Sequence, residues 1–204
     1  MTAEEFATLL TFATAMSFTP GPNTMLATAL AANFGMRRTW RFIVAVPTGW
    51  TLMMIACGLG LGALVFALPW LRSAVKAIGV AYLVWLAWKL ANTRALAPAA
   101  AARMQVGFWQ GVALQFVNIK AWMLALALAA GWVATSAGHV SRNPGERLAI
   151  VCAVMAVFAL SSNAAYALAG SLLRRWLAEN DRLLWFNRGM ALLLLATAVW
   201  MALI

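Results

Sequence analysis

Long stretches without charged residues dominate the chain, and short segments that carry Lys and Arg separate them. A helix needs roughly 20 apolar residues to cross the hydrocarbon core of a bilayer. The pattern therefore predicts about six transmembrane helices in an all-α membrane protein. These stretches are residues 6–34, 42–68, 77–88, 106–137, 148–173 and 183–204, and their only charged residues are Lys120 in the fourth and Arg188 in the sixth. The third is long enough only if it starts near Leu71, with Lys76 and Lys89 reaching toward opposite headgroup layers.

Polar residues interrupt the first and the fourth of these stretches. The first contains Pro20-Gly21-Pro22-Asn23, and two prolines remove two backbone donors and forbid a regular helix through them. Backbone groups freed inside a membrane must bond to protein or line a wet cavity. The helix that restarts near Thr24 would present free N–H groups able to receive a carboxylate. A simple packing kink is the alternative interpretation. In the fourth stretch the interruption is at Asn118.

The spacing of these stretches predicts one transporter domain made of two halves. An Ala- and Pro-rich linker at about 92–105 divides repeat 1, about 1–91, from repeat 2, about 106–204. Three spans in each half would place the halves upside down relative to each other, as in many secondary transporters. Gly79-Val-Ala-Tyr-Leu in the third span has a weak counterpart in Gly189-Met-Ala-Leu-Leu of the sixth.

The distribution of Lys and Arg along the chain predicts how this bundle is oriented in the membrane. The net charge of +10 is spread in ones and twos between apolar runs, with no basic face, so we expect no nucleic-acid partner. Ten Lys and Arg lie in the first, third and fifth loops and four in the second and fourth. The positive-inside rule then places the odd loops in the cytoplasm and the C-terminus in the periplasm of a bacterial inner membrane. Whether the first segment crosses fully or turns back is left open.

Composition narrows the class further. An apolar content of 65% with 10% charged residues excludes an ordinary soluble domain. The acidic N-terminus lacks the basic start of a signal peptide, so the first apolar run is expected to be retained. Cys57 and Cys152 lie inside predicted spans and suggest neither a disulfide framework nor a metal site. The spans contain no acid pair and no nucleophile–base pair, which argues against an enzyme, and no cofactor is expected.

Lys120 is the one charged residue well inside a predicted span. A buried ammonium there is costly unless it faces a partner or water, and no span contains Asp or Glu. We therefore expect Lys120 to bind a substrate carboxylate, or to be neutral at rest and take up a proton during the cycle. A tilted span that brings Lys120 near an interface is the alternative. Asn118 is a candidate substrate contact because it lies beside Lys120. Asn163 is a candidate because it stands where an acidic residue within the membrane is otherwise missing.

Several motifs resemble the LysE/RhtB family of bacterial amino-acid exporters along nearly the whole chain. They are Thr19-Pro-Gly-Pro-Asn23, Gly35-Met-Arg-Arg38, residues 79–89, Phe108-Trp109, Ala113-Leu-Gln-Phe-Val-Asn-Ile-Lys120, Asn163 and Ala167-Leu-Ala-Gly170. Ile119 stands where most members have proline in an Asn-Pro-Lys motif, and in this the chain resembles members that export cysteine and O-acetylserine. Many members also have an Asp in the fifth span, where this chain has Ser162-Asn163.

The resemblance implies proton-motive-force-driven export of small amino acids or their derivatives, with amino acid, protons and the lipid bilayer as partners. Export of homoserine, threonine or another neutral amino acid is the alternative within transport, and a non-transporting membrane scaffold is the alternative outside it. The oligomeric state is left open, a homodimer included. The expected substrate-binding residues are Pro20, Gly21, Pro22, Asn23, Thr24, Asn118, Lys120 and Asn163.

Overall fold

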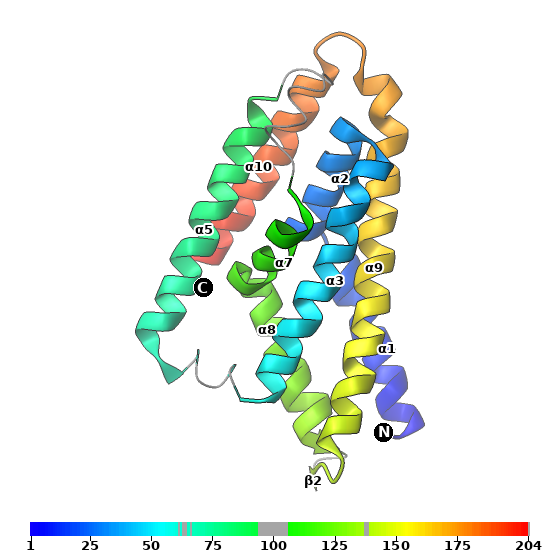
Figure 1. Ribbon diagram of the computed structural model, residues 1–204, viewed down its shortest axis with the longest axis vertical. Coiled ribbons are helices and arrows are strands. Elements are labelled where there is room, and N and C mark those ends of the chain that lie inside the picture. Colours follow the sequence, from blue (N-terminus) through cyan, green and yellow to red (C-terminus); the bar gives the residue numbers. More distant parts are fainter. Residues whose placement is uncertain (61, 63–64, 66, 94–105, 137–138, 204) are drawn as a thin grey trace.

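The computed structural model describes residues 1–60, 62, 65, 67–93, 106–136 and 139–203, and shows an elongated helical bundle (Figure 1). Residues 94–105 of the predicted linker lie outside the described residues. The helices are α1 (Ala3–Phe18), α2 (Pro22–Phe34), α3 (Met36–Gly58), α5 (Pro69–Ala91), α7 (Phe108–Val117), α8 (Ile119–Leu128), the π-helix η1 (Ala129–Ala134), α9 (Pro144–Leu177) and α10 (Arg182–Leu203). The strands β1 (Thr135–Ser136) and β2 (His139–Val140) form a short antiparallel hairpin.

Four helices of the described chain are long and apolar enough to cross a membrane, namely α3, α5, α9 and α10. A fifth span results if α7 is taken together with α8 and η1, although the two parts meet at an angle of 70°. Helices α1 and α2, with 16 and 13 residues, are each too short to cross alone. The prediction of an all-α membrane protein is confirmed, and six spans result only if α1 and α2 count as one.

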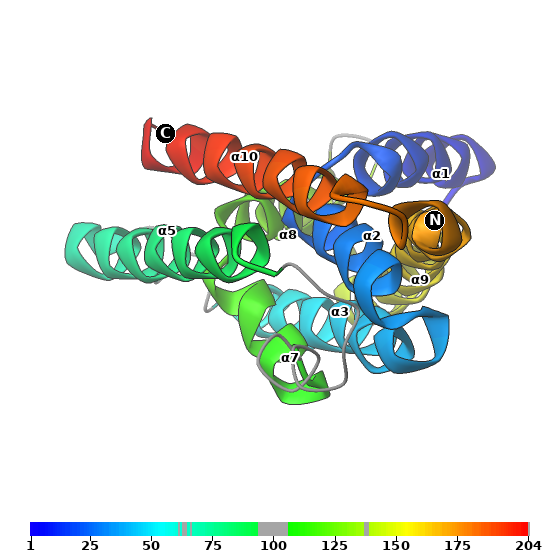
Figure 2. The same ribbon diagram turned by 90° about the horizontal axis from the view of Figure 1, so that it is seen from above.

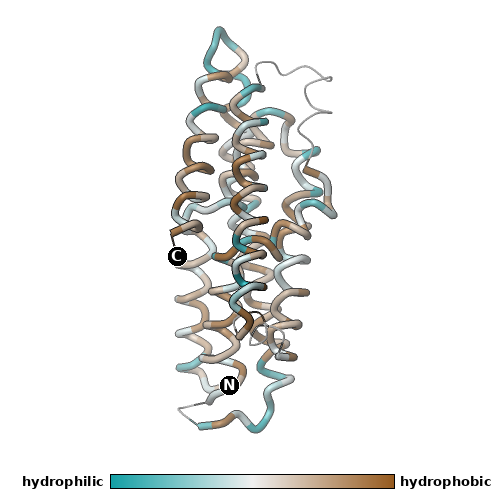
Figure 3. The backbone as a smooth tube through the Cα atoms, turned by 90° about the vertical axis from the view of Figure 1, so that its left-hand side faces the viewer, coloured by the Kyte–Doolittle hydropathy of each residue, from teal (hydrophilic) through white to brown (hydrophobic). Residues whose placement is uncertain are grey.

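Helices α1 and α2 run in succession along the length of α9. At one end, Glu5 in the first turn of α1 pairs with Arg147 in the first turn of α9. At the other end, a Cβ placed on Gly35 would lie 3.6 Å from the guanidinium of Arg174, in the last turn of α9. Because α9 has 34 residues and is about 50 Å long, the first segment passes through the bundle and does not turn back (Figures 1 and 3).

The order of elements repeats in the two halves of the chain. In each half a broken pair is followed by two long helices, first α1–α2, α3 and α5, and then α7–α8, α9 and α10. Seen from above, α5 and α10 lie side by side on one flank of the bundle (Figure 2). The division of the chain into two repeats and the inverted relation of the halves both stay predictions.

The second span is shorter than its apolar stretch. Helix α3 ends at Gly58, whereas the sequence predicted a span to Leu68. Gly60 follows with a φ of +99°, a conformation that glycine adopts at little cost and that cannot continue an α-helix. The apolar stretch is therefore longer than α3, because the positive φ of Gly60 cannot continue the helix.

Two apolar clusters stack along the bundle. One joins α2, the first half of α3, α5, α7, the first residue of α8, the second half of α9 and α10. The other joins α1, the second half of α3, α8 and the first half of α9. The breaks at Thr19–Gly21 and at Asn118 fall where one cluster gives way to the other. Hydrophilic residues gather at both ends of the molecule and hydrophobic ones predominate between them (Figure 3). The fold thus places its two backbone breaks in the middle of an apolar bundle.

Gly79 lets α5 approach the second break closely. A Cβ at this position would overlap the carbonyl oxygen of Val117, the last residue of α7. We expect Gly79→Ala to lower the free energy of unfolding by about 1–3 kcal/mol, because backbone atoms must shift to admit the methyl group. Gly189→Ala is the matched control, since no described atom lies within 4 Å of its Cβ position. Thermal unfolding in detergent measures both, and equal midpoints for the two variants would contradict the prediction.

Candidate functional site

The first break, between α1 and α2, arises because two prolines lack an N–H group. Side chains form hydrogen bonds with the backbone groups around it. Pro20 and Pro22 cannot donate to the preceding turn, which leaves carbonyl groups at the end of α1 without helical partners. The Tyr166 hydroxyl donates to the carbonyl oxygen of Phe18 at 3.0 Å. Helix α2 restarts at Pro22, and the Thr24 hydroxyl accepts from the Gly21 N–H at 3.0 Å. The N–H groups of Asn23 and Thr24 thus lie in the first turn, where a helix has no partners for them.

The second break, at Asn118, needs no proline. Asn118 has an extended backbone, and its side-chain oxygen accepts from the Lys120 N–H at 3.1 Å. It therefore caps the start of α8, a role for which asparagine is among the best residues. The Trp122 indole donates to the carbonyl oxygen of Phe116 at 2.8 Å, which satisfies one group at the end of α7. Ile119 in place of proline consequently leaves the break intact.

The two breaks meet, which brings together residues that the sequence predicted to bind one substrate. The Lys120 ammonium lies 3.4 Å from the carbonyl oxygen of Thr19, and a Cβ on Gly21 would be 3.3 Å from the same nitrogen. The amide groups of Asn23 and Gln115 bond reciprocally at 2.9 and 3.1 Å. Gln115 is fully buried, so this pair joins the two halves inside the bundle.

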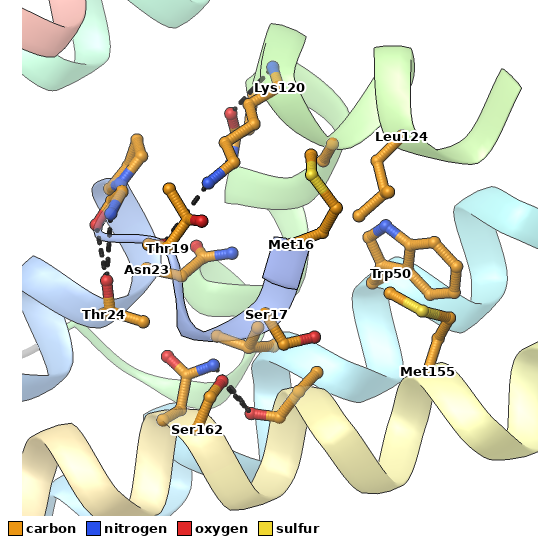
Figure 4. Close-up of a pocket in the computed structure, with 17 residues that line it drawn as sticks. Met16, Ser17, Thr19, Asn23, Thr24, Trp50, Lys120, Leu124, Met155 and Ser162 are labelled. Carbon is orange, nitrogen blue, oxygen red and sulfur yellow. Dashed lines mark hydrogen bonds between the residues drawn. The ribbon is translucent and has the colours of Figure 1, made fainter. Parts of the chain in front are cut away.

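A cavity of about 70 Å³, open at its mouth, lies at this junction (Figure 4). Seven of the eight predicted site residues line it, and Pro20 lines an adjoining apolar groove instead. The seven are Gly21, Pro22, Asn23, Thr24, Asn118, Lys120 and Asn163. They are joined by Met16, Ser17, Thr19, Val46, Trp50, Ala121, Leu124, Met155, Ala159 and Ser162. The cavity thus draws on α1, α2, α3, α8 and α9.

The polar groups of this cavity suit a small zwitterion. The Lys120 ammonium has three N–H donors, and one of them donates to the Thr19 carbonyl oxygen. The five acidic residues of the chain all lie at helix ends or in the turn between α9 and α10, so the ammonium has no acid beside it in the bundle. No group of His, Cys, Asp or Glu suited to a metal ion occurs among the described residues. A carboxylate from outside the protein is therefore the natural partner for Lys120.

Two residues that line the cavity each have a buried polar atom without a hydrogen-bond partner in the described chain. The Asn163 amide nitrogen donates to the Ala159 carbonyl oxygen at 2.8 Å, but its oxygen is unpaired. The indole nitrogen of Trp50 is likewise unpaired, and Trp50 is only 5% exposed. Asn163 was predicted from the sequence and Trp50 was not. Buried polar atoms are almost always satisfied, so each is a candidate contact for a bound molecule.

Comparison with known proteins assigns nearly the whole chain to one protein family. The model of the LysE type translocator family matches residues 14–203. Cysteine/O-acetylserine efflux proteins are similar over most of their length: 32% identical in Klebsiella pneumoniae subsp. pneumoniae, covering 86% of each chain, and 30% identical in Escherichia coli, covering 98% of each. No solved structure gives a significant match. This protein, with two broken helices that meet around a lysine in the middle of its bundle, belongs to the LysE type translocator family.

Proposed function

We propose that this protein exports small amino acids or their derivatives, of the cysteine and O-acetylserine kind, from the cytoplasm, driven by the proton motive force. The observation that carries the proposal is the cavity in which Lys120 faces the first break without a carboxylate beside it. The names of the similar efflux proteins support the substrate class. They also support a multi-pass protein of the bacterial inner membrane.

The cavity offers complementary contacts for both charges of an amino acid. The substrate carboxylate would bind the Lys120 ammonium and the N–H groups in the first turn of α2, where the helix dipole favours an anion. The substrate ammonium would donate to the unpaired Asn163 oxygen. Asn23 and Asn118 would hold the two helix ends in register, because one bonds Gln115 and the other caps α8. The pairing of Lys120 with a bound carboxylate would offset the cost of burying the ammonium.

Proton coupling would use the same lysine. Lys120 is the only charged side chain of the chain that lies well inside a predicted span. Export driven by proton entry needs the proton on the empty site as it returns inward, and off the site as the substrate leaves. Lys120 would therefore be protonated when it meets the carboxylate in the cytoplasm and would release its proton there before the loaded site turns outward, with the N–H groups at the start of α2 holding the carboxylate.

Alternating access would move the two halves against each other around this cavity. The loop charges orient the bundle with the turn between α9 and α10 in the cytoplasm and the C-terminus in the periplasm. The halves are joined at both ends of the molecule by polar side chains. Glu5 pairs with Arg147 at one end, and Asn33 exchanges amide hydrogen bonds with Asn187 at 2.7 and 3.0 Å at the other. During the transport cycle, the Glu5–Arg147 pair and the Asn33–Asn187 pair would break alternately.

Efflux from reconstituted vesicles tests the proposal. Vesicles loaded with radiolabelled O-acetylserine, cysteine, homoserine or threonine are expected to release the first two fastest. A proton gradient should accelerate release, and a protonophore should abolish the acceleration. Faster release of homoserine or threonine would assign the protein to a neutral amino-acid substrate instead. Vesicles that release none of the four, with or without a gradient, would favour a non-transporting scaffold.

A further inference from the structure

The indole nitrogen of Trp50 has no role in the interactions that hold the bundle together. Trp50 lines the cavity, and its nitrogen is buried and has no hydrogen-bond partner in the described chain. The other buried Trp near the breaks, Trp122, has a paired nitrogen, which donates to the carbonyl oxygen of Phe116 at 2.8 Å. A donor left unpaired inside a protein costs free energy, and it calls for a specific explanation.

The cavity has a polar side and an apolar side, and Trp50 is on the apolar one (Figure 4). Thr19, Asn23, Thr24 and Lys120 lie together on the polar side. Trp50 lies opposite them beside Met16, Leu124 and Met155, with its ring nitrogen toward Met16 and Leu124. A zwitterionic head bound at the polar side would therefore direct its side chain toward Trp50.

We infer that Trp50 sets substrate specificity by donating its indole N–H to an acceptor oxygen on the substrate side chain, such as an ester carbonyl. This inference rests on the proposed function and refines its substrate class. An ester oxygen is a good acceptor, whereas a thiol sulfur is a weak one. O-Acetylserine would gain the contact and cysteine would not.

The surrounding side chains permit this contact. Two of the residues beside Trp50 are methionines, whose unbranched side chains fit irregular gaps and move easily. An arriving ester group would displace them from the indole edge and bond the nitrogen. The nitrogen points toward Met16 and Leu124 and has almost no contact with solvent. The apolar remainder of this wall would pack against the methyl group of an acetyl ester.

Trp50→Phe tests the inference, because it removes the N–H and keeps a buried aromatic ring. We expect O-acetylserine efflux to fall about ten-fold relative to cysteine efflux in the same variant. Trp122→Phe is the matched control, since its indole bonds the protein itself, and its ratio of the two rates should equal that of the wild type. Equal losses for both substrates in Trp50→Phe would overturn the inference and leave Trp50 a packing residue.

The wild-type protein gives a second test that requires no variant. Norleucine has a side chain of similar length to O-acetylserine but no acceptor. O-Acetylserine should compete about ten-fold better than norleucine against labelled cysteine efflux. Equal competition would also overturn the inference, while cysteine efflux itself would still support the proposed function. If the wild-type protein moves no amino acid at all, the proposed function fails first.

Discussion

Replacing Lys120 by methionine is expected to lower amino-acid efflux about 100-fold. Methionine keeps most of the apolar stem of lysine and removes the ammonium that faces the Thr19 carbonyl oxygen. Removal of one partner from a buried charge pair commonly costs 2–5 kcal/mol, and each 1.4 kcal/mol is a factor of ten in binding. Initial rates from vesicles loaded with radiolabelled cysteine measure the effect, with the amount of inserted protein determined in parallel.

Lys76→Met is the matched control for this variant. Lys76 lies in α5, is also partly buried and does not line the cavity, so its loss should change efflux less than two-fold. Similar losses in both variants would mean that positive charge matters only in general. Normal efflux by the Lys120 variant would remove this residue from the mechanism and with it the present account of substrate binding.

Lys120→Arg separates substrate binding from proton coupling. Arginine keeps a positive charge but does not release its proton in proteins. If Lys120 carries the coupled proton, this variant should still bind substrate and exchange it across the membrane, but a proton gradient should no longer accelerate net efflux. Acceleration equal to that of the wild type would show that the proton travels by another route.

The first break could be predicted from the sequence because its cause is local. Proline lacks an N–H group wherever it stands, so Pro20 and Pro22 interrupt a helix in almost any context. The second break was predicted as a polar interruption, but its 70° bend was not. That bend depends on the Asn118 side chain turning back to the Lys120 N–H, one of several bonds an asparagine can make. The sequence shows that such a bond is possible, and the fold selects it.

Trp50 could not be assigned to the cavity from the sequence. Its surroundings come from α1, α8 and α9, whose packing a single sequence does not reveal. Tryptophan in membrane proteins is typical of the headgroup layer, and Trp40, Trp70, Trp109 and Trp185 are indeed well exposed. One signal was available, since Trp50 falls in the middle of an uncharged span, far from both predicted interfaces. An indole at that depth needs an acceptor from a neighbouring helix or from a ligand.

Arg147 shows the same limit at the end of the bundle. The sequence counted it among the loop charges that orient the protein, yet it is 4% exposed and lies in the first turn of α9. Its guanidinium donates to both carboxylate oxygens of Glu5 at 3.1 Å each, and to the carbonyl oxygen of Trp132. Glu5 is 142 residues away along the chain, so no local pattern could pair them. Trp132 in turn donates to the Glu5 carbonyl oxygen at 3.2 Å.

Arg147→Gln is expected to lower the free energy of unfolding by about 3–5 kcal/mol, because it leaves the half-buried Glu5 carboxylate without its cation. For a chain of this length that corresponds to a fall of roughly 6–20 °C in the thermal midpoint. Arg142→Gln is the control, since Arg142 is exposed in the same connection and its loss should shift the midpoint by about 2 °C or less. Thermal unfolding in detergent or nanodiscs measures both.

The double variant Glu5→Gln with Arg147→Gln distinguishes a lost ion pair from lost packing. Two neutral amides can still bond each other, and no unpaired charge is left in the bundle, so the double variant should regain at least half of the lost stability. A double variant no more stable than Arg147→Gln would contradict the ion-pair account and assign the loss to the stem of Arg147 and its bond to Trp132. In the proposed alternating-access cycle, this pair would have to break when the two halves separate at that end.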